Sequence, residues 1–174
     1  MSKLIIVCGL PASGKTTFAT ELSRQINIVC LHKDSIKESL YINTGSTTLD
    51  DSRRVGLLSV RLLLELAEGI IANDIDVILE APFSYAEDYH IFDKWISKYD
   101  VVVYNIICST PTKELKDRFN SRPRHHAHHD PERVYSPQDE SVYEKLPGKS
   151  IKITTNRPVK TLVREVIKDL LNTK

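Results

Sequence analysis

The sequence has few cysteines and no long hydrophobic run. Cys8, Cys30 and Cys108 are widely spaced and lie in apolar segments, so we expect small buried side chains rather than a zinc site or a catalytic thiol. No apolar run approaches the ~20 residues that a membrane-spanning helix needs. The apolar run at the N-terminus is too short for a signal peptide. We therefore expect a cytoplasmic protein without a membrane partner.

The sequence also lacks an excess of charge of either sign. Its net charge is +1, from 24 Lys and Arg residues and 23 Asp and Glu residues. This balance argues against a general nucleic-acid coat, although it leaves room for a local basic patch. Internal repeats and Gly- or Ser-rich linkers are absent as well. The length of 174 residues and the 41% hydrophobic content predict one domain over residues 1–174. Nothing in the sequence indicates the oligomeric state.

What is present is an alternation of apolar segments and helical patterns. The predicted strands are Leu4–Cys8, Ile28–Leu31, Asp76–Ala81, Val101–Ile107 and Ser150–Thr154. The predicted helices are Thr16–Gln25, Asp51–Asn73, Ala86–Lys98, Thr112–Asn120 and Val159–Leu171. The expected apolar stripe of the long helix is Val55, Leu58, Leu62, Leu66 and Ile70. Because strands that alternate with helices need crossover connections, this order predicts a parallel sheet in one three-layer α/β domain.

The motif Gly9-x-x-x-x-Gly14-Lys15-Thr16 has the pattern of a phosphate-binding loop, and it lies between a predicted strand and a predicted helix. Its glycines let successive backbone N–H groups point into one concavity, where they bind a polyphosphate beside the positive end of a helix dipole. We expect Lys15 to reach the β- and γ-phosphates and the Thr16 hydroxyl to ligate Mg²⁺. The expected nucleotide-binding residues of the loop are Gly9, Pro11, Ala12, Ser13, Gly14, Lys15, Thr16 and Thr17.

Other classes of nucleotide-binding protein carry signatures that this sequence lacks. The guanine-binding motif Asn-Lys-x-Asp of GTPases is missing, and so is the Leu-Ser-Gly-Gly signature of transporter ATPases. The chain is also too short for a ring ATPase with a second lid domain. The compact kinases remain, and they need an acceptor site beside the phosphates and an arginine-bearing lid.

The acceptor site is predicted at HKDSIKESL, directly after the second strand, because ligands of such sheets bind at the carboxyl ends of the strands. Asp34 is a candidate to accept or orient the proton of the attacking hydroxyl. Lys37, with Lys33, is a candidate to hold an anionic group of the acceptor. The alternative is an ordinary helix start, with Asp34 as the N-cap and Lys37 in solvent.

The third strand ends in VILEAPFS, which places Glu80 at the same edge of the sheet. A carboxylate at this position is expected to bind Mg²⁺ through water or to orient the attacking hydroxyl. The alternative is a structural ion pair with a lysine or arginine.

The segment after the fourth strand is predicted to supply the lid, over about residues 118–148. Arg118 and Arg122 are four residues apart and would share one helical face, with Arg124 close behind. Guanidinium groups match the charge that develops on phosphoryl oxygens, so these arginines are expected to act in transfer. A solvated basic helix and a surface excursion are the alternatives. The nearby histidines, His125, His126, His128 and His129, leave four interpretations open: a transition-metal site, a phosphate contact, a part of the acceptor pocket, or exposed loop.

The segments GLPASGKTT, HKDSIKESL, VILEAPFS and LKDRFNSRPR occur in the order and spacing seen in small P-loop kinases. This group includes shikimate and gluconate kinases, chloramphenicol phosphotransferase, zeta toxins and the kinase domain of phage-type polynucleotide kinase. In layout the chain is most similar to the short AAA-domain P-loop kinases. The resemblance implies a P-loop NTPase fold with five parallel strands in the order 2-3-1-4-5, and ATP as donor.

The resemblance also implies roles for individual residues. Asp34 matches the catalytic or acceptor-binding aspartate of these kinases, and Lys37 matches the basic residue that often follows it. Arg118 and Arg122 match their lid arginines, and Asn156 lies in TTNRP, which matches the loop that passes the adenine. Glu80 stands where several relatives have aspartate, and the APFS that follows it is unlike the polynucleotide kinases.

The first functional hypothesis is an ATP- and Mg²⁺-dependent kinase that phosphorylates a hydroxyl of a small molecule. A zeta-type toxin acting on a sugar nucleotide is a variant of it. The second hypothesis is a polynucleotide 5′-hydroxyl kinase, whose basic track would be Lys33, Lys37, Arg53 and Arg54. The third is a nucleotide-dependent switch or ATPase without transfer.

Overall fold

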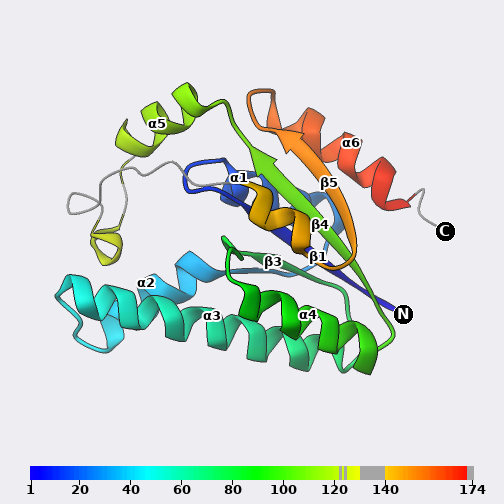
Figure 1. Cartoon of the computed structure of the whole chain (residues 1–174), viewed down its shortest axis with the longest axis horizontal. Coiled ribbons are helices and arrows are strands. Elements are labelled where there is room, and N and C mark those ends of the chain that lie inside the picture. Colours follow the sequence, from blue (N-terminus) through cyan, green and yellow to red (C-terminus); the bar gives the residue numbers. More distant parts are fainter. Residues whose placement is uncertain (122, 124, 130–139, 172–174) are drawn as a thin grey trace.

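The protein is built around one parallel sheet of five strands, in the order β2-β3-β1-β4-β5 (Figure 1). The computed structural model describes residues 1–121, 123, 125–129 and 140–171. The strands are β1 (Ser2–Gly9), β2 (Cys30–His32), β3 (Val77–Glu80), β4 (Val101–Ser109) and β5 (Lys149–Thr154). The order, the parallel pairing and the place of every strand confirm the predictions from the sequence.

Helices cover both faces of this sheet. They are α1 (Lys15–Ile26), α2 (Lys33–Asn43), α3 (Leu49–Ile71), α4 (Ala86–Lys98), α5 (Thr112–Ser121) and α6 (Val159–Leu171), with short 3₁₀ helices η1 (His126–His128) and η3 (Glu140–Lys145). Helices α1 and α6 pack on one face, and α3 and α4 pack on the other. Helix α2 is absent from the predicted helices, although the sequence analysis allowed a helix start at its first turn.

The alternation of side chains along β1 explains why both faces need a cover. Leu4 and Ile6 point into the core under α3 and α4, whereas Ile5 and Val7 point into the core under α1 and α6. All four side chains are fully buried, so a strand that is apolar on both faces becomes the centre of the sheet. Its carboxyl end, where Gly9 begins the glycine-rich loop, is thereby held in a fixed place between β3 and β4.

Helix α3 buries a different edge from the one that the leucine periodicity predicted. Leu58, Leu62 and Leu66 are 43%, 38% and 52% exposed. The buried positions are Ser52, Val55, Ser59, Leu63, Leu64, Ala67 and Ile71. Small side chains such as Ser52 and Ala67 let neighbouring elements approach this edge closely. A pattern of large apolar residues in the sequence does not reveal such positions. The stripe prediction is therefore wrong at Leu58, Leu62 and Leu66, whereas Val55 is buried and Ile70 is partly buried against the core.

Helix α2 lies against α3, and η1 packs on the pair. Tyr41, Val55 and Ala127 form a small buried cluster of their own, apart from the two main cores. The start of α3 is fixed by a capping box, in which Thr48 and Asp51 satisfy each other's backbone N–H groups. This subassembly places the segment that follows α5 beside the beginning of α2.

The cysteines largely behave as expected from the sequence. Cys8 and Cys108 are buried, Cys30 is partly buried, and all three are free thiols. Burial raises the pKa of the Cys8 and Cys30 thiols to about 12, and it raises the pKa of Cys108 as well. Among the described residues, no helix combines the length and the apolar character that crossing a membrane requires.

Candidate active site

The glycine-rich loop connects β1 to α1, as the sequence predicts. Helix α1 begins at Lys15, and its N-cap, Gly14, has a φ of 85° and makes no side-chain cap bond. The first turn of α1 therefore presents backbone N–H groups at the carboxyl edge of the sheet, where an anion is stabilised by them and by the helix dipole.

Gly9 has a structural reason to be glycine that the motif alone does not reveal. Its φ is +136°, and a Cβ there would overlap the backbone carbonyl oxygen of Cys108 in the neighbouring strand β4. Ser13 is equally enclosed: it is fully buried, and its Oγ has no hydrogen-bond partner among the described residues. Neither residue lines the adjoining cavity, so their contribution is to the shape of the loop.

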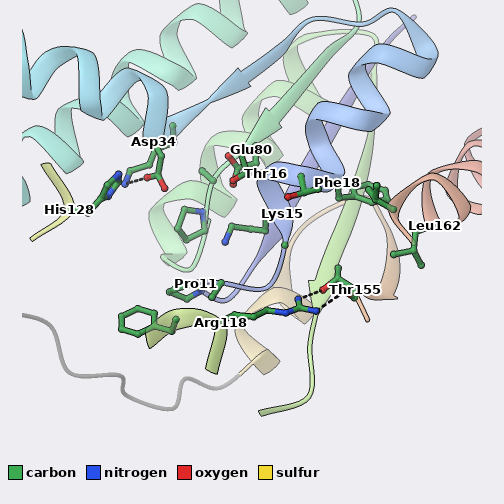
Figure 2. Close-up of a pocket in the computed structure, with 18 of the residues that line it drawn as sticks. Pro11, Lys15, Thr16, Phe18, Asp34, Glu80, Arg118, His128, Thr155 and Leu162 are labelled. Atoms are coloured by element: carbon green, nitrogen blue, oxygen red, sulfur yellow. Dashed lines mark hydrogen bonds and ion pairs between the residues drawn. The ribbon is translucent and has the colours of Figure 1, made fainter. Parts of the chain in front are cut away.

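A cavity with a volume of about 630 Å³ opens at this loop. Six of the predicted nucleotide-binding residues line it, namely Pro11, Ala12, Gly14, Lys15, Thr16 and Thr17. Asp34, Lys37, Glu80 and Arg118 line it too, so the structure brings these predicted site residues together. Figure 2 shows Lys15, Thr16 and Glu80 near the centre, Asp34 with His128 at one end, and Arg118 with Thr155 along another side.

Lys15 extends from the first turn of α1 back over the loop. Its Nζ donates to the carbonyl oxygen of Leu10 at 2.9 Å, and the residue is only 8% exposed. The ammonium group is thus held over the backbone N–H groups of the loop, where a phosphate chain would meet both.

Glu80 is the buried acid of the site. It is 3% exposed, and its Oε2 lies 3.2 Å from Nδ1 of His32, the residue that pairs with it across β2 and β3. The partner is therefore a histidine, not the lysine or arginine of the alternative interpretation. With the Thr16 hydroxyl in the same cavity, the site offers the oxygen ligands that Mg²⁺ prefers.

Asp34 lies in the first turn of α2 and faces the cavity. The N-cap of this helix is His32, so the interpretation of Asp34 as an N-cap is wrong. Its Oδ1 forms an ion pair with Lys33 Nζ at 3.0 Å, and its side chain is 40% exposed. A carboxylate that is accessible at the mouth of the cavity can meet a hydroxyl from solvent.

Lys37 lies one helical turn after Lys33 and is buried. The alternative interpretation, in which Lys37 is exposed to solvent at an ordinary helix start, is therefore wrong. It is 2% exposed, and its Nζ donates to Ser52 Oγ at 2.8 Å. Ser52 in turn donates to the carbonyl oxygen of Ala127 at 2.6 Å. Lys37 is thereby fixed against α3 and η1 while it lines the cavity.

Arg118 lies near the end of α5 and bonds to the loop after β5. Its Nη2 donates to the Thr155 carbonyl oxygen at 3.0 Å, and its Nη1 donates to Thr155 Oγ1 at 3.2 Å. Glu114, one turn earlier, forms an ion pair with it at 3.3 Å. Arg122 and Arg124, also predicted for the lid, lie outside the described residues.

Thr155 is a site residue that the sequence analysis missed. The prediction for its loop was Asn156, which is exposed and does not line the cavity, whereas Thr155 and Arg157 do. Thr155 Oγ1 donates to the Ser13 carbonyl oxygen at 2.7 Å and contacts Thr110 Oγ1 at 2.7 Å. The only sequence signal was a pair of threonines at the end of the fifth strand, too common a pattern to single out.

Of the four histidines after α5, His128 alone lines the cavity. It is 3% exposed, and its Nε2 lies 2.9 Å from Glu38 Oε1. His129 instead contacts the Tyr41 hydroxyl at 2.7 Å. In the part of the chain that the structure describes, no group of three or more His, Cys, Asp or Glu side chains is arranged to hold a metal ion, so the transition-metal interpretation gains no support.

The sequence profile of the AAA domain family matches residues 4–144 of this chain. The chain belongs to the AAA domain family. The matched residues include the glycine-rich loop, α2 with Asp34 and Lys37, β3 with Glu80, and α5 with Arg118. A search of curated protein sequences finds no match to this chain.

Solved structures of similar fold include kinases of several kinds. A kinase candidate from Chloroflexus aurantiacus is 24% identical and has a TM-score of 0.78, with 96% of this chain and 97% of that chain covered. The APS kinase of Mycobacterium tuberculosis, in complex with AMPPNP and APS, is 17% identical, with a TM-score of 0.61 and 98% of each chain covered. Shikimate kinase from Acinetobacter baumannii, in complex with shikimate, is 15% identical, with a TM-score of 0.61 and 100% and 95% covered.

These similarities show that the family member described here has the three-layer αβα fold of P-loop kinases, with the predicted strand order. At these levels of identity they show the fold alone. The chemistry of this chain therefore has to be argued from its own cavity.

Proposed function

We propose that this protein is an ATP- and Mg²⁺-dependent kinase that transfers the γ-phosphoryl group to a hydroxyl of a small molecule. The observation that carries the proposal is the position of Asp34 in the same cavity as the glycine-rich loop, Lys15 and Arg118. A phosphate-binding loop alone fits many nucleotide-binding proteins, whereas a loop with an accessible carboxylate beside it fits transfer to a hydroxyl.

The residues that line the cavity have different roles in phosphoryl transfer. The loop N–H groups and Lys15 bind the phosphates, and Arg118, held by Thr155, faces them from α5. Asp34 accepts a hydrogen bond from the acceptor hydroxyl and orients it or takes its proton as it attacks phosphorus. The oxygen–phosphorus bond to ADP breaks, and the departing proton of the hydroxyl ends on Asp34 or on solvent.

Thr16 and Glu80 are the residues that would hold Mg²⁺, the threonine through its hydroxyl and the glutamate through its carboxylate. Both line the cavity, and Glu80 is buried, with the His32 ring as its side-chain hydrogen-bond partner among the described residues. When bound, the ion neutralises phosphate charge. His32 holds the Glu80 carboxylate at the edge of the sheet whether or not Mg²⁺ is bound.

The lid remains part of this proposal, over about residues 118–148. The described parts of this segment, α5, η1 and η3, are attached to the core at separate points. Arg118 is bonded to Thr155, Ser52 bonds to Ala127, and Ser109 donates to the Glu140 carboxylate at 3.1 Å. We expect this segment to close over bound substrate while these contacts keep it attached to the domain.

The basic track that a polynucleotide kinase needs is not supported. Arg53 and Arg54 of that track are paired with Asp50 and Asp51 at 2.9 and 3.1 Å. A small-molecule acceptor is the better match to a cavity of this size.

The test is ADP formation from ATP and Mg²⁺ in the presence of nucleosides, sugars, antibiotics or 5′-hydroxyl oligonucleotides. The proposal expects at least one small hydroxyl compound to accelerate ADP formation and to appear phosphorylated in equal amount. Slow ATP hydrolysis that no hydroxyl compound accelerates would indicate a switch or ATPase instead. Phosphorylation of the oligonucleotide alone would indicate the polynucleotide kinase.

A further inference from the structure

Helix α3 carries a row of exposed leucines on the side that faces away from the sheet. Leu58, Leu62 and Leu66 are spaced four residues apart and are 43%, 38% and 52% exposed, so they form one ridge along the helix. Leu57 beside them is 65% exposed. Figure 1 shows α3 along the lower side of the molecule. Single exposed leucines are ordinary, whereas several on one helix face form an apolar surface that indicates an interaction site.

The leucine ridge of α3, Leu58, Leu62 and Leu66, takes no part in the candidate active site. The described residues that line the cavity all come from other elements than α3. A partner that covers the ridge therefore contacts none of the residues that line the cavity, and the ridge needs a role apart from the proposed function.

Two charged side chains flank the leucine ridge. Arg61 and Glu65 are exposed, and among the described residues neither side chain forms an ion pair or a hydrogen bond. By contrast, Glu68 of the same helix is paired with Lys98 at 3.0 Å. A positive and a negative charge beside the ridge are thus available to a partner.

The pattern of this surface is complementary to itself. Leu62 lies midway between Leu58 and Leu66, so an antiparallel copy of α3 about a two-fold axis at Leu62 places Leu58 of each copy against Leu66 of the other. The helical repeat puts Arg61 and Glu65 on the same side of Leu62, so the same axis brings Arg61 of each copy close to Glu65 of the other. A parallel copy would place like charges against each other instead.

The packing geometry also fits a second helix. Ridges of residues four apart interdigitate when two helices cross at about −50°, the commonest class of helix packing in globular proteins. Gly69, one turn beyond the ridge, is exposed, and a Cβ there would meet no atom within 4 Å. A glycine inside a helix lowers its stability, and here it leaves room beside the ridge for side chains of the other copy.

We propose that two copies of this chain associate through the leucine ridge of α3, with the two helices antiparallel about a two-fold axis at Leu62. The leucines of the two ridges cover each other, and Arg61 of each copy pairs with Glu65 of the other. Because each copy uses the same surface, association closes at two copies.

The first test is the mass of the full chain in solution, measured by sedimentation equilibrium over a range of micromolar concentrations. We expect the mass of two chains, each of 19.8 kDa. A mass of one chain at every concentration would overturn the proposal. A mass that keeps rising beyond two copies would overturn it as well, because a closed two-fold contact cannot produce larger species.

The second test is Leu62→Glu, which places two carboxylates face to face at the axis. We expect the Kd of the dimer to rise at least a hundredfold. Ile96→Glu on α4 is the matched control, since Ile96 is 39% exposed, and it should leave the dimer intact. Both variants should bind AMPPNP as the wild type does, because neither residue lines the cavity. An unchanged dimer in Leu62→Glu would place the contact on another face and refute the proposal.

The third test uses Arg61→Glu and Glu65→Arg, two changes at exposed positions. Each variant alone opposes like charges across the axis, so we expect its dimer Kd to rise at least tenfold. An equal mixture of the two variants restores opposite charges at both contacts, and its Kd should return to within about threefold of the wild type. Recovery in the mixture cannot arise within one chain, so a mixture that stays as weak as its components would contradict the antiparallel contact.

Discussion

Thr155 Oγ1 donates a hydrogen bond of 2.7 Å to the carbonyl oxygen of Ser13, and so joins the loop after β5 to the glycine-rich loop. The same hydroxyl accepts from Arg118 Nη1 at 3.2 Å. One threonine therefore couples three segments at the nucleotide end of the cavity. We therefore expect a displacement of Arg118 to displace the Ser13 backbone as well.

Thr155→Val keeps the shape of this side chain and removes its hydroxyl. We expect nucleotide affinity to fall roughly three- to tenfold and the free energy of unfolding to fall by about 1–2 kcal/mol, because buried partners lose their hydrogen bonds. Titration calorimetry and chemical denaturation measure the two effects. Thr161→Val, at an exposed position of α6, is the control and should change neither. Equal behaviour of the two variants would show that the coupling has no consequence.

Lys15→Ala removes the ammonium group that the loop holds beside Leu10. We expect nucleotide binding or phosphoryl transfer to be lost, because the cation that meets the phosphates is gone. Binding of a fluorescent ATP analogue reports the change directly. Lys160→Ala, on the exposed side of α6, should bind normally. Wild-type kinetics in Lys15→Ala would refute the assignment of the loop.

Asp34→Asn removes the carboxylate but preserves the size of the side chain. We expect ATP affinity to stay within about threefold and the transfer rate to fall at least a hundredfold, in line with loss of a general base. Asp93→Asn, at an exposed position of α4, is the matched control and should transfer normally. Unchanged turnover in Asp34→Asn would remove Asp34 from the mechanism.

Gly9→Ala tests whether the glycine serves packing as well as the loop. The added Cβ would collide with the backbone oxygen of Cys108, so we expect a loss of roughly 2–4 kcal/mol in the free energy of unfolding. Gly45→Ala is the control: its φ of +65° is also positive, but no atom lies within 4 Å of its Cβ position. There we expect about 1 kcal/mol of backbone strain. Similar losses at the two positions would contradict the packing argument.

Asp88, in the first turn of α4, makes stability depend on pH. Burial raises the pKa of its carboxyl group from 3.8 to about 6. Between these values the folded state retains a proton that the unfolded state has released, so the contribution of Asp88 to stability is present at pH 4 and is lost as the pH rises through 6. We expect Asp88→Asn to gain stability relative to the wild type over this range, measured by denaturation at pH 4, 5, 6 and 7. A difference between Asp88→Asn and the wild type that stays constant over this range would contradict the shift.

The sequence predicts the sheet well, and it predicts which residues lie together at the carboxyl edge of the sheet, because both depend on local patterns. Continuous apolar runs such as that of β1 have one favourable place in a parallel sheet, and the spacing of Gly9, Gly14 and Lys15 is a motif that is recognised within a short stretch of sequence. Positions at the carboxyl ends of strands, such as Asp34 and Glu80, are likewise brought to one edge by the fold itself.

Features that depend on contacts between segments far apart in the sequence are predicted poorly. Ser52 and Ala127 are 75 residues apart, and the sequence around each of them does not predict their contact. The same is true of Thr155 and Ser13, and of Glu38 and His128. On α3 the buried edge carries small side chains such as Ser52 and Ala67, which a search for large apolar residues does not detect.

The cavity lining holds a net charge of +3, whereas the whole chain holds only +1, so the remaining residues together carry −2. We expect a positively charged cavity in a weakly negative exterior to attract anions such as ATP over a long range. Capture of nucleotide should consequently be fastest in dilute buffer, and added salt should slow arrival while leaving departure almost untouched.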